Sequence, residues 1–389
     1  MKGKNSVKRF VIIHATAGIG HTKAALAIKK TFDKMLADRA LGQQPEEAFD
    51  IRIIDSLDYM TDFFRSSYQG SYLLMVKKLL PVWGALYSIT NHPFVNVFVK
   101  IARRMTNAMH SRRLIDYLLE YQPDVVISTH FLATEVVSHL KEKKILTTRL
   151  ITVVTDYRLH AFWIAKNVDA YIVAGEQAKQ ELIAWKVEPS RIKTFGIPIG
   201  PEFMEPGMDK VVLRRRLGLA EDLFTILVVG GGFGIGPIED IIKTIERWDK
   251  AAQIAVICGY NPQLLERVKA LQDALRHPIK AFGFVENMFE FMGASEVLIS
   301  KSGGITITEA LAKELPMIIV SPIPGQESRN CEFLVEHKAA VKAKDVAHLA
   351  EILEGFLKDP RKLSDMKSAI KDLKHPMASA DIVKFASEI

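Results

Sequence analysis

Three glycine-rich turns in the chain have the composition of loops that hold phosphate groups. Residues 14–21 read His-Ala-Thr-Ala-Gly-Ile-Gly-His, residues 230–237 read Gly-Gly-Gly-Phe-Gly-Ile-Gly-Pro, and residues 301–304 read Lys-Ser-Gly-Gly. Glycines let backbone N–H groups approach an anion closely, and a helix that begins beyond the turn adds a favourable dipole. None of the turns has the Gly-Lys-Ser/Thr ending of a Walker loop. We expect the contacts to come from Gly20, Gly231, Gly232, Gly234, Ser302, Gly303 and Gly304.

Two further motifs offer side chains that can exchange a proton with a hydroxyl. His21 directly follows the first glycine turn, where the positive end of a helix lowers its pKa and favours the neutral ring. Asp156 and His160 follow a predicted strand and can orient or deprotonate a hydroxyl. We predict that His21 is the catalytic base, with Asp156 and His160 as alternates. The competing interpretation is that these residues are helix caps and structural side chains.

Polar residues near the third turn suit the recognition of sugar hydroxyls. Glu309 is expected in the first turn of the following helix, where its carboxylate can accept both hydroxyls of a ribose, although the helix dipole would also favour a Glu there. A later loop carries Gln326, Glu327, Arg329 and Asn330. The sequence has no Asp-x-Asp pair and no His/Cys cluster with metal spacing. We therefore expect neither an active-site metal nor another cofactor.

The elements that must position these residues alternate along the chain. Short runs rich in Val and Ile alternate with segments of helical period, which predicts buried parallel strands and an α/β fold. A Pro and Gly cluster at 196–207 indicates a linker. We predict two doubly wound domains, 1–200 and 201–370, with a helix at 371–389 that packs back on the first. The expected strands are 10–15, 50–55, 124–128, 150–155, 170–174, 224–229, 253–258, 279–282, 296–300 and 317–320.

Length and composition limit the class of protein. The 389 residues are 48% hydrophobic and 25% charged, which is typical of a globular chain and too long for one small module. Two cysteines are too few for a disulfide framework, so we expect a cytoplasmic, reducing compartment. No apolar run reaches the length of a membrane span. Any membrane contact is therefore expected to be peripheral.

The positive charge of the chain is concentrated in one segment. Residues 63–115 contain eight Lys or Arg and no Asp or Glu, and the rest of the chain carries 44 basic against 45 acidic residues. The segment also holds eight Phe, Tyr or Trp, a mixture typical of helices that lie on a membrane. Single-stranded nucleic acid is a competing partner, and a helical region with core aromatics and solvated cations is the simpler alternative.

Together these motifs resemble the glycosyltransferases that make glycosyl diacylglycerols, namely plant monogalactosyldiacylglycerol synthases and bacterial processive diacylglycerol glucosyltransferases. The resemblance covers nearly the whole chain. It is carried by Gly18-x-Gly20-His21, Thr155-Asp156 with His160 and Trp163, Gly196-Ile197-Pro198-Ile199, the 230–237 turn, Ser302-Gly303-Gly304-x-Thr306-x-Thr308-Glu309, and Pro324-Gly325-Gln326-Glu327.

The resemblance implies a GT-B fold of two facing Rossmann-like domains with an interdomain cleft. It implies that the C-terminal domain binds a UDP-sugar, with Glu309 at the ribose, the glycine turns and the Thr306 motif near the phosphates, and Phe284 and Val285 near uracil. The residues around the sugar and diphosphate would be Gln326, Glu327, Arg329 and Asn330. The N-terminal domain would take the lipid, with His21 as the candidate base or a diphosphate contact and residues 63–115 on an anionic membrane.

The expected function is therefore the inverting transfer of glucose or galactose from a UDP-sugar to 1,2-diacylglycerol, at the inner face of the cell membrane and without nucleic acid. One alternative is transfer of N-acetylglucosamine to a polyprenyl-linked acceptor. Others are a UDP-sugar 2-epimerase, which would act without lipid, and a binding protein of the membrane surface, which would not turn over the nucleotide sugar.

Overall fold

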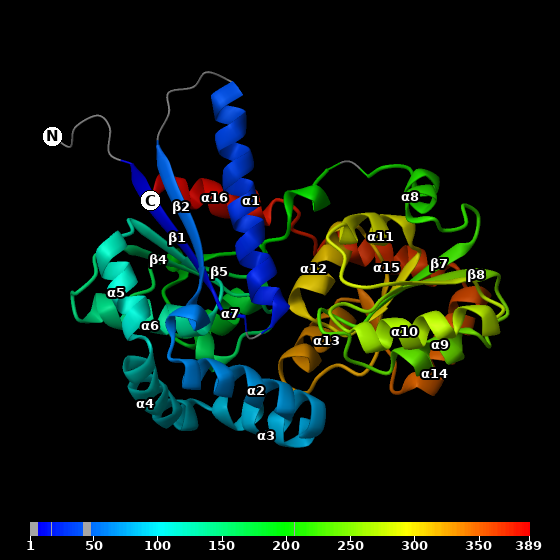
Figure 1. Cartoon of the computed structure of the whole chain (residues 1–389), viewed down its shortest axis with the longest axis horizontal. Coiled ribbons are helices and arrows are strands. Elements are labelled where there is room, and N and C mark those ends of the chain that lie inside the picture. The colour runs from blue at the N-terminus through cyan, green and yellow to red at the C-terminus, as the bar shows by residue number, and fades with distance from the viewer. Residues whose placement is uncertain (1–6, 17, 42–47, 206) are drawn as a thin grey trace. The chain divides into compact units, whose positions relative to one another are not determined.

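The computed structural model describes residues 7–16, 18–41, 48–205 and 207–389. The chain divides into two compact units. The first comprises Met1–Pro201, Pro324–Gln326 and His375–Ile389, and the second comprises Glu202–Ile323 and Glu327–Lys374. Within the described residues each unit holds one six-stranded sheet, and all its strands run parallel (Figure 1). The predicted α/β fold of two domains is confirmed.

The first sheet has the strand order β2-β1-β3-β4-β5-β6. Its strands are β1 Lys8–His14, β2 Phe49–Asp55, β3 Val125–Ser128, β4 Arg149–Val153, β5 Ala170–Ile172 and β6 Ile192–Lys193. The first five correspond to the strands expected from the sequence. The sequence analysis missed β6, because a strand of two residues gives no periodic signal.

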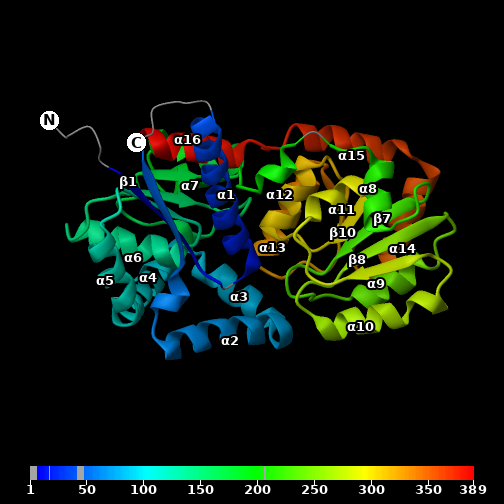
Figure 2. The same cartoon turned by 45° about the horizontal axis from the view of Figure 1, so that its top comes forward.

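Helices cover both faces of the first sheet. Phe10 and Ile12 of β1 pack against α1 (Ile19–Leu41) and α16 (Ala378–Glu388), which lie side by side (Figure 2). Val11 and Ile13 point to the other face, which α5 (Arg112–Tyr121), α6 (Phe131–Glu142) and α7 (Glu176–Ala184) cover. Burial on two faces explains why these strands are continuously apolar and do not alternate with polar residues.

The C-terminal helix is joined to the first strand by a lysine. The Lys8 Nζ donates hydrogen bonds to the carbonyl oxygens of Ser387 at 2.8 Å and Ile389 at 2.7 Å. Carbonyl groups at a helix C-terminus lack intrahelical partners, so an ammonium group stabilises that end. Residues 375–389 thereby belong to the same unit as β1.

The basic segment folds as α2 (Asp62–Lys78), α3 (Leu80–Thr90), α4 (Pro93–His110) and the start of α5. Two of its cations do not face outward as we expected. Arg103 pairs with the buried Glu135 at 2.6 Å, and Arg104 pairs with Glu142 at 2.5 Å. Both carboxylates lie on α6, so these arginines fasten α4 to α6. The sequence could not show this, because the partners lie 32 and 38 residues away.

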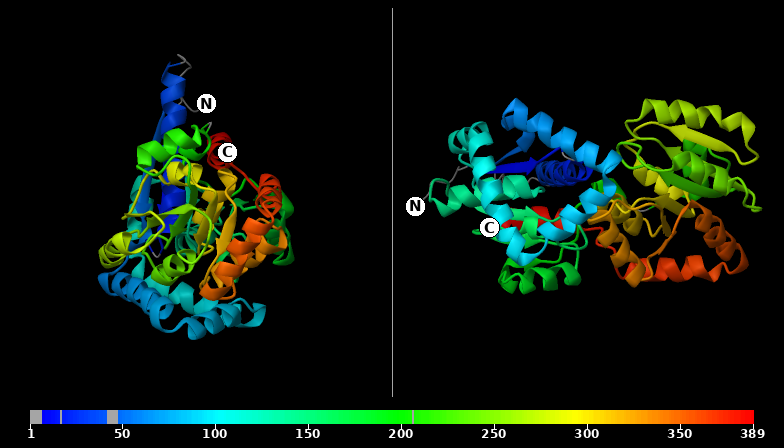
Figure 3. Two further views of the ribbon diagram at one scale, coloured as in Figure 1. Left: turned by 90° about the vertical axis from the view of Figure 1, so that its right-hand side faces the viewer. Right: turned by 90° about the horizontal axis from the view of Figure 1, so that it is seen from below.

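The second sheet has the order β12-β11-β10-β7-β8-β9. Its strands are β7 Phe224–Val229, β8 Ala252–Ile257, β9 Ile279–Phe282, β10 Val297–Ser300, β11 Met317–Ile319 and the unpredicted β12 Ala340–Lys342. Figure 3 gives two further views of these strands and their helices. The helices are α8 Lys210–Leu217, α9 Ile238–Ile245, α10 Pro262–Ala270, α11 Met288–Ala294, α12 Gly304–Ala312, α13 Gln326–Glu336, α14 Val346–Lys358 and α15 Arg361–Lys371.

Both sheets reverse their winding direction at one place. The chain moves outward from β1 to β2 and then returns to place β3 on the other side of β1. In the second sheet the same reversal lies between β7 and β10. Loops that follow the two strands at such a switch point diverge to opposite faces of the sheet, and ligands of doubly wound folds bind there. The switch points therefore locate the candidate sites.

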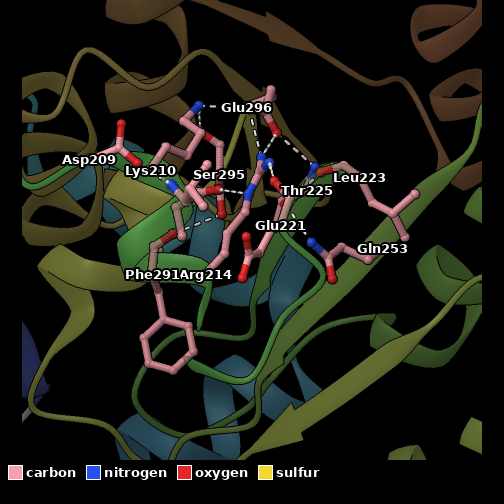
Figure 4. A network of polar contacts seen from close by, with 12 residues as sticks. Asp209, Lys210, Arg214, Glu221, Leu223, Thr225, Gln253, Phe291, Ser295 and Glu296 are labelled. Carbon is pink, nitrogen blue, oxygen red and sulfur yellow. Dashed lines mark hydrogen bonds and ion pairs between the residues drawn. The ribbon is translucent and has the colours of Figure 1, made fainter. Parts of the chain in front are cut away.

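A buried arginine binds groups at the amino-terminal ends of two central strands of the second sheet, at the end opposite the switch point (Figure 4). Arg214 of α8 donates to both carboxylate oxygens of Glu296, at 2.9 and 2.7 Å, and to the carbonyl oxygen of Ala294 at 3.0 Å. Glu296 also accepts from Lys210 at 2.6 Å and from the Thr225 N–H at 2.7 Å. This network joins α8 to the amino-terminal ends of β7 and β10.

We predict that Arg214→Met lowers the free energy of unfolding by about 3 kcal/mol, because it removes the bidentate partner of a largely buried carboxylate. Urea unfolding followed by circular dichroism measures the change. Arg215→Met is the matched control, since Arg215 is the next residue, is exposed and pairs only with the exposed Glu221 among its described contacts. Equal stability of the two variants would contradict the structural role of Arg214.

Candidate functional site

Three histidines gather at the switch point of the first sheet. His14 ends β1, His21 lies in the first turn of α1, and His130 caps α6 directly after β3. The rings of His21 and His130 meet edge to face with centroids 4.6 Å apart, and Thr22 joins His14 to α1 through a 3.2 Å contact to Nδ1. We call these residues the histidine cluster. Of the three, the sequence analysis named only His21 as a site residue.

The hydrogen bonds of His21 determine which ring nitrogen can act as a base. Its Nδ1 lies 2.8 Å from the carbonyl oxygen of Thr129 and 3.0 Å from the Thr155 hydroxyl. A carbonyl oxygen only accepts, so Nδ1 must carry the proton. The neutral ring then has its lone pair on Nε2. Thr129 also donates from its hydroxyl to the His21 carbonyl oxygen at 3.0 Å, which fixes the backbone of this turn.

The histidine cluster favours neutral rings. Burial lowers the pKa of His21 to about 4, against the raising effect of the Thr129 carbonyl, and His14 lowers it further. Burial is also the main cause that lowers the pKa of His14 and of His130. We expected the helix dipole to lower the pKa of His21, whereas the main cause in the structure is desolvation. At pH 7 the His21 ring is therefore neutral.

Asp156 and His160 lie near the same strand ends but are engaged in other contacts. Asp156 is buried and accepts from the Trp163 indole N–H at 3.3 Å, and the Trp163 ring lies 6.1 Å from the ring of His21. The Nδ1 of His160 accepts from the Phe162 N–H at 3.2 Å, so its Nε2 donates to the Tyr87 carbonyl at 3.0 Å. Both ring nitrogens of His160 thus hold the backbone, which favours His21 as the base.

Gly20 is the second residue of α1 and is partly buried beside His21. In the second unit, the 230–237 turn follows β7 at the other switch point. Gly234 has φ +58°, and a Cβ there would lie 2.2 Å from the Cys258 carbonyl oxygen, so only glycine fits. Gly231 has φ +69° and a far more open surrounding. Gly234 is therefore needed to form the turn, whereas a side chain at Gly231 would meet only the end of the Lys301 side chain.

The turn after β10 is tied to α13 by buried polar groups. Ser302 donates to the Glu327 carbonyl oxygen at 2.6 Å, and Asn330 donates to the Ser302 carbonyl oxygen at 3.1 Å. The Glu327 carboxylate accepts from the Ile323 N–H at 2.8 Å, and burial raises its pKa. Ser302, Glu327 and Asn330 thus hold the turn together. Gly303 and Gly304, which begin α12, remain partly exposed.

Glu309 is buried, but not where the sequence analysis placed it. It is the sixth residue of α12, so the expectation that it lies in the first helical turn is wrong. The helix dipole is strongest in the first turn and does not account for a buried carboxylate further along. The ribose-binding role of Glu309 stays a prediction. Thr306 occupies the first turn and is partly exposed.

The remaining predicted residues lie in the loop after β9 or on α13. Phe284 and Val285 follow β9, and the exposed Phe284 ring stacks on Tyr260 with centroids 4.2 Å apart. Arg329 is partly buried on α13, whose first residue, Gln326, groups with the first unit. A flat aromatic pair can stack on a nucleobase. The sequence analysis missed Tyr260, which lies 24 residues from its stacking partner.

Two parts of the chain match the models of known protein families. Residues 21–199 match the family described as monogalactosyldiacylglycerol (MGDG) synthase, and residues 225–382 match the glycosyltransferase family 28 C-terminal domain. The chain is 31% identical to monogalactosyldiacylglycerol synthase 1, chloroplastic, of Arabidopsis thaliana, over 98% of this chain and 71% of that protein. It is 28% identical to the processive diacylglycerol beta-glucosyltransferase of Bacillus pumilus, over 98% of this chain and 94% of that protein.

Among solved structures, MurG of Acinetobacter baumannii is similar, with a TM-score of 0.59 and 15% identity. The likeness covers 98% of this chain and all of the MurG chain. At this identity it shows the fold alone, and it supports the GT-B fold expected from the sequence.

The depressed pKa of His21 predicts a specific sensitivity to acid. In the unfolded chain a histidine titrates near pH 6.5, so between pH 6.5 and about 4 the unfolded state binds a proton that the folded ring does not. Stability is therefore lost as the pH falls through this window. NMR titration of the His21 ring should give a pKa of about 4, and His21→Gln should flatten this part of the stability curve. His92→Gln, on an exposed histidine, should not.

Proposed function

Because this chain belongs to the family of the monogalactosyldiacylglycerol synthases and processive diacylglycerol glucosyltransferases, we propose that it transfers a hexose from a UDP-sugar to the free hydroxyl of 1,2-diacylglycerol. The second unit binds the nucleotide sugar through the turns after β7 and β10. The first unit binds the lipid and supplies the base. The product is a β-glycosyl diacylglycerol, formed with inversion.

The reaction needs one proton acceptor and one stabiliser of the leaving group. The hydroxyl oxygen of the acceptor attacks C1 of the sugar while its proton passes to His21 Nε2. The bond between C1 and the β-phosphate oxygen breaks, and its electron pair stays with the phosphate, so UDP leaves. Backbone N–H groups of the glycine turns stabilise that charge.

The observation that carries this proposal is the tautomer of His21. Its Nδ1–H is bound to the Thr129 carbonyl, its pKa is near 4, and its Nε2 keeps a lone pair at the switch point of the first sheet. A histidine that only capped a helix would accept a hydrogen bond from a backbone N–H through its lone pair. His130 accepts in this way from the N–H of Leu132, and His160 accepts from the N–H of Phe162.

Helix α4 supports a lipid acceptor because its amphipathicity is inverted. Large apolar side chains at the spacing of one helix face are 53–74% exposed, namely Phe94, Phe98, Ile101, Met105 and Met109. The opposite face carries polar residues that point inward: Asn96 and Asn107 are buried, and Lys100 donates to the Ile164 carbonyl at 3.1 Å. A surface helix of a globular protein normally buries its apolar stripe.

We propose that the apolar stripe of α4 enters the surface of an anionic membrane. The segment that carries it has no acidic residue, and the exposed Arg112 and Arg113 follow it directly. Within the part of the chain that the structure describes, no helix has both the length and the apolar character that crossing a membrane requires. Binding to the surface would raise the concentration of the lipid acceptor around the first unit.

The test of the proposed function is incubation of the protein with diacylglycerol vesicles and a panel of UDP-sugars, followed by identification of the lipid product. We expect a glycosyl diacylglycerol from UDP-glucose or UDP-galactose. His21→Gln should reduce turnover by roughly a hundredfold or more, while UDP affinity stays unchanged, because the base is lost but the donor site is not. Conversion of UDP-N-acetylglucosamine without any lipid product would instead indicate an epimerase.

The membrane contact is tested by charged substitutions in the apolar stripe. Phe98→Glu combined with Met105→Glu should reduce co-sedimentation with anionic vesicles at least tenfold, since each large side chain contributes about 1.5–3 kcal/mol when it leaves water. The control is Leu26→Glu, on an apolar residue of α1 that is also exposed. Vesicle binding that the double variant leaves intact, or that salt does not weaken, would exclude this surface.

A further inference from the structure

Lys301 lies at the centre of the second switch point. It is the first residue after β10, and its Nζ is 4.0 Å from the place that a Cβ on Gly231 would occupy. The ammonium group therefore lies against the backbone of the 230–237 turn. The preceding residue, Ser300, is paired in register with Val229 and donates to its carbonyl oxygen at 3.0 Å. The two turns are thus fastened together, and Lys301 lies where they meet.

The position of Lys301 is set by Glu327. The Lys301 side chain is only 14% exposed, and its Nζ lies 3.7 Å from the Glu327 carboxylate. Glu327 offsets the buried charge and takes up only part of the three N–H donors of the ammonium group. The carboxylate is itself held by the Ile323 N–H, and the Glu327 carbonyl by Ser302. Lys301 is a cation held in place with donors to offer.

A nucleoside diphosphate needs such a cation when it leaves. As the bond from C1 of the sugar breaks, its electron pair stays on the β-phosphate oxygen, and the leaving group gains one full negative charge. Backbone N–H groups supply only partial charges, whereas an ammonium group binds phosphate as a point charge. The acceptor proton goes to His21 Nε2, and Lys301 keeps its own proton throughout.

We propose that Lys301 binds the diphosphate of the nucleotide and stabilises the charge that it gains on departure, and that Glu327 is a positioning residue for Lys301. This inference rests on the proposed function, because it takes the ligand of the second unit to be a nucleoside diphosphate. It gives Glu327, which was expected around the sugar and diphosphate, a specific role there, and it adds a catalytic residue that the sequence analysis did not name.

Calorimetric titration of Lys301→Met with UDP and with uridine tests the proposal. UDP affinity should fall about ten- to a hundredfold, as expected for loss of a charge-assisted contact, while uridine affinity stays within twofold of the wild type. Lys301→Arg should keep most of the UDP affinity. Lys269→Met is the matched control, since Lys269 lies on α10 of the same unit and pairs with the exposed Glu266. It should bind UDP normally.

Two outcomes would overturn the role of Lys301: unchanged UDP affinity in folded Lys301→Met, or equal losses of UDP and uridine affinity. If Lys301→Met does not fold, Lys301→Gln takes its place and must show the same selective loss. A wild-type protein that glycosylates diacylglycerol while Lys301→Met binds UDP normally would contradict Lys301 alone. A wild-type protein that binds UDP through Lys301 but forms no glycolipid would contradict the transfer reaction alone.

Discussion

The reversal of winding within each sheet is the constraint on which the chemistry of this protein depends. Both faces of each sheet are buried, so the helices that connect the strands must pack on both sides of the sheet. Where the direction changes, between β1 and β3 and between β7 and β10, neighbouring loops leave in opposite directions and backbone groups at the strand ends are left without a covering helix. The histidine cluster and the glycine turns after β7 and β10 lie at these places.

The two units use charge in opposite ways at their switch points. In the first unit, burial keeps the histidine rings neutral, which allows His21 and His130 to pack 4.6 Å apart and leaves a lone pair on His21. In the second unit, a cation is retained in a mostly buried position because Glu327 offsets its charge. A base must be uncharged before it accepts a proton, and a fixed positive charge stabilises a departing diphosphate. The two environments fit the roles proposed for His21 and Lys301.

Helix α4 links the proposed lipid-binding surface to the interior of the first unit. Its apolar residues face outward, and its arginines reach carboxylates on α6, the helix that His130 caps. A buried carboxylate such as Glu135 has to be paired, so the ion pair with Arg103 maintains the inverted orientation of the helix. The guanidinium of Arg103 also lies 5.0 Å from the Phe131 ring and 4.4 Å from the Phe162 ring. Helix α4 and the aromatic residues beside the histidine cluster are therefore packed as one structure.

Much of the fold followed from local sequence patterns. Runs of Val and Ile predicted ten of the strands, because a strand buried on two faces is continuously apolar, and the glycine turns identified where three of these strands end. The strands β6 and β12 were missed, since each contains a single Val or Ile and so forms no apolar run. Composition also located the positive charge between residues 63 and 115.

Only the tertiary structure decided what the candidate residues do. The sequence named His21, but the Thr129 carbonyl that fixes its tautomer comes from the residue after β3, 108 residues away. It grouped Arg103 with the surface cations, although its carboxylate partner on α6 turns it inward. It placed Glu327 around the sugar and diphosphate, and only the fold shows that the carboxylate lies 3.7 Å from the Lys301 ammonium group. Residue type and local spacing determine which elements form, but protonation, burial and charge pairing depend on neighbours that only the folded chain brings together.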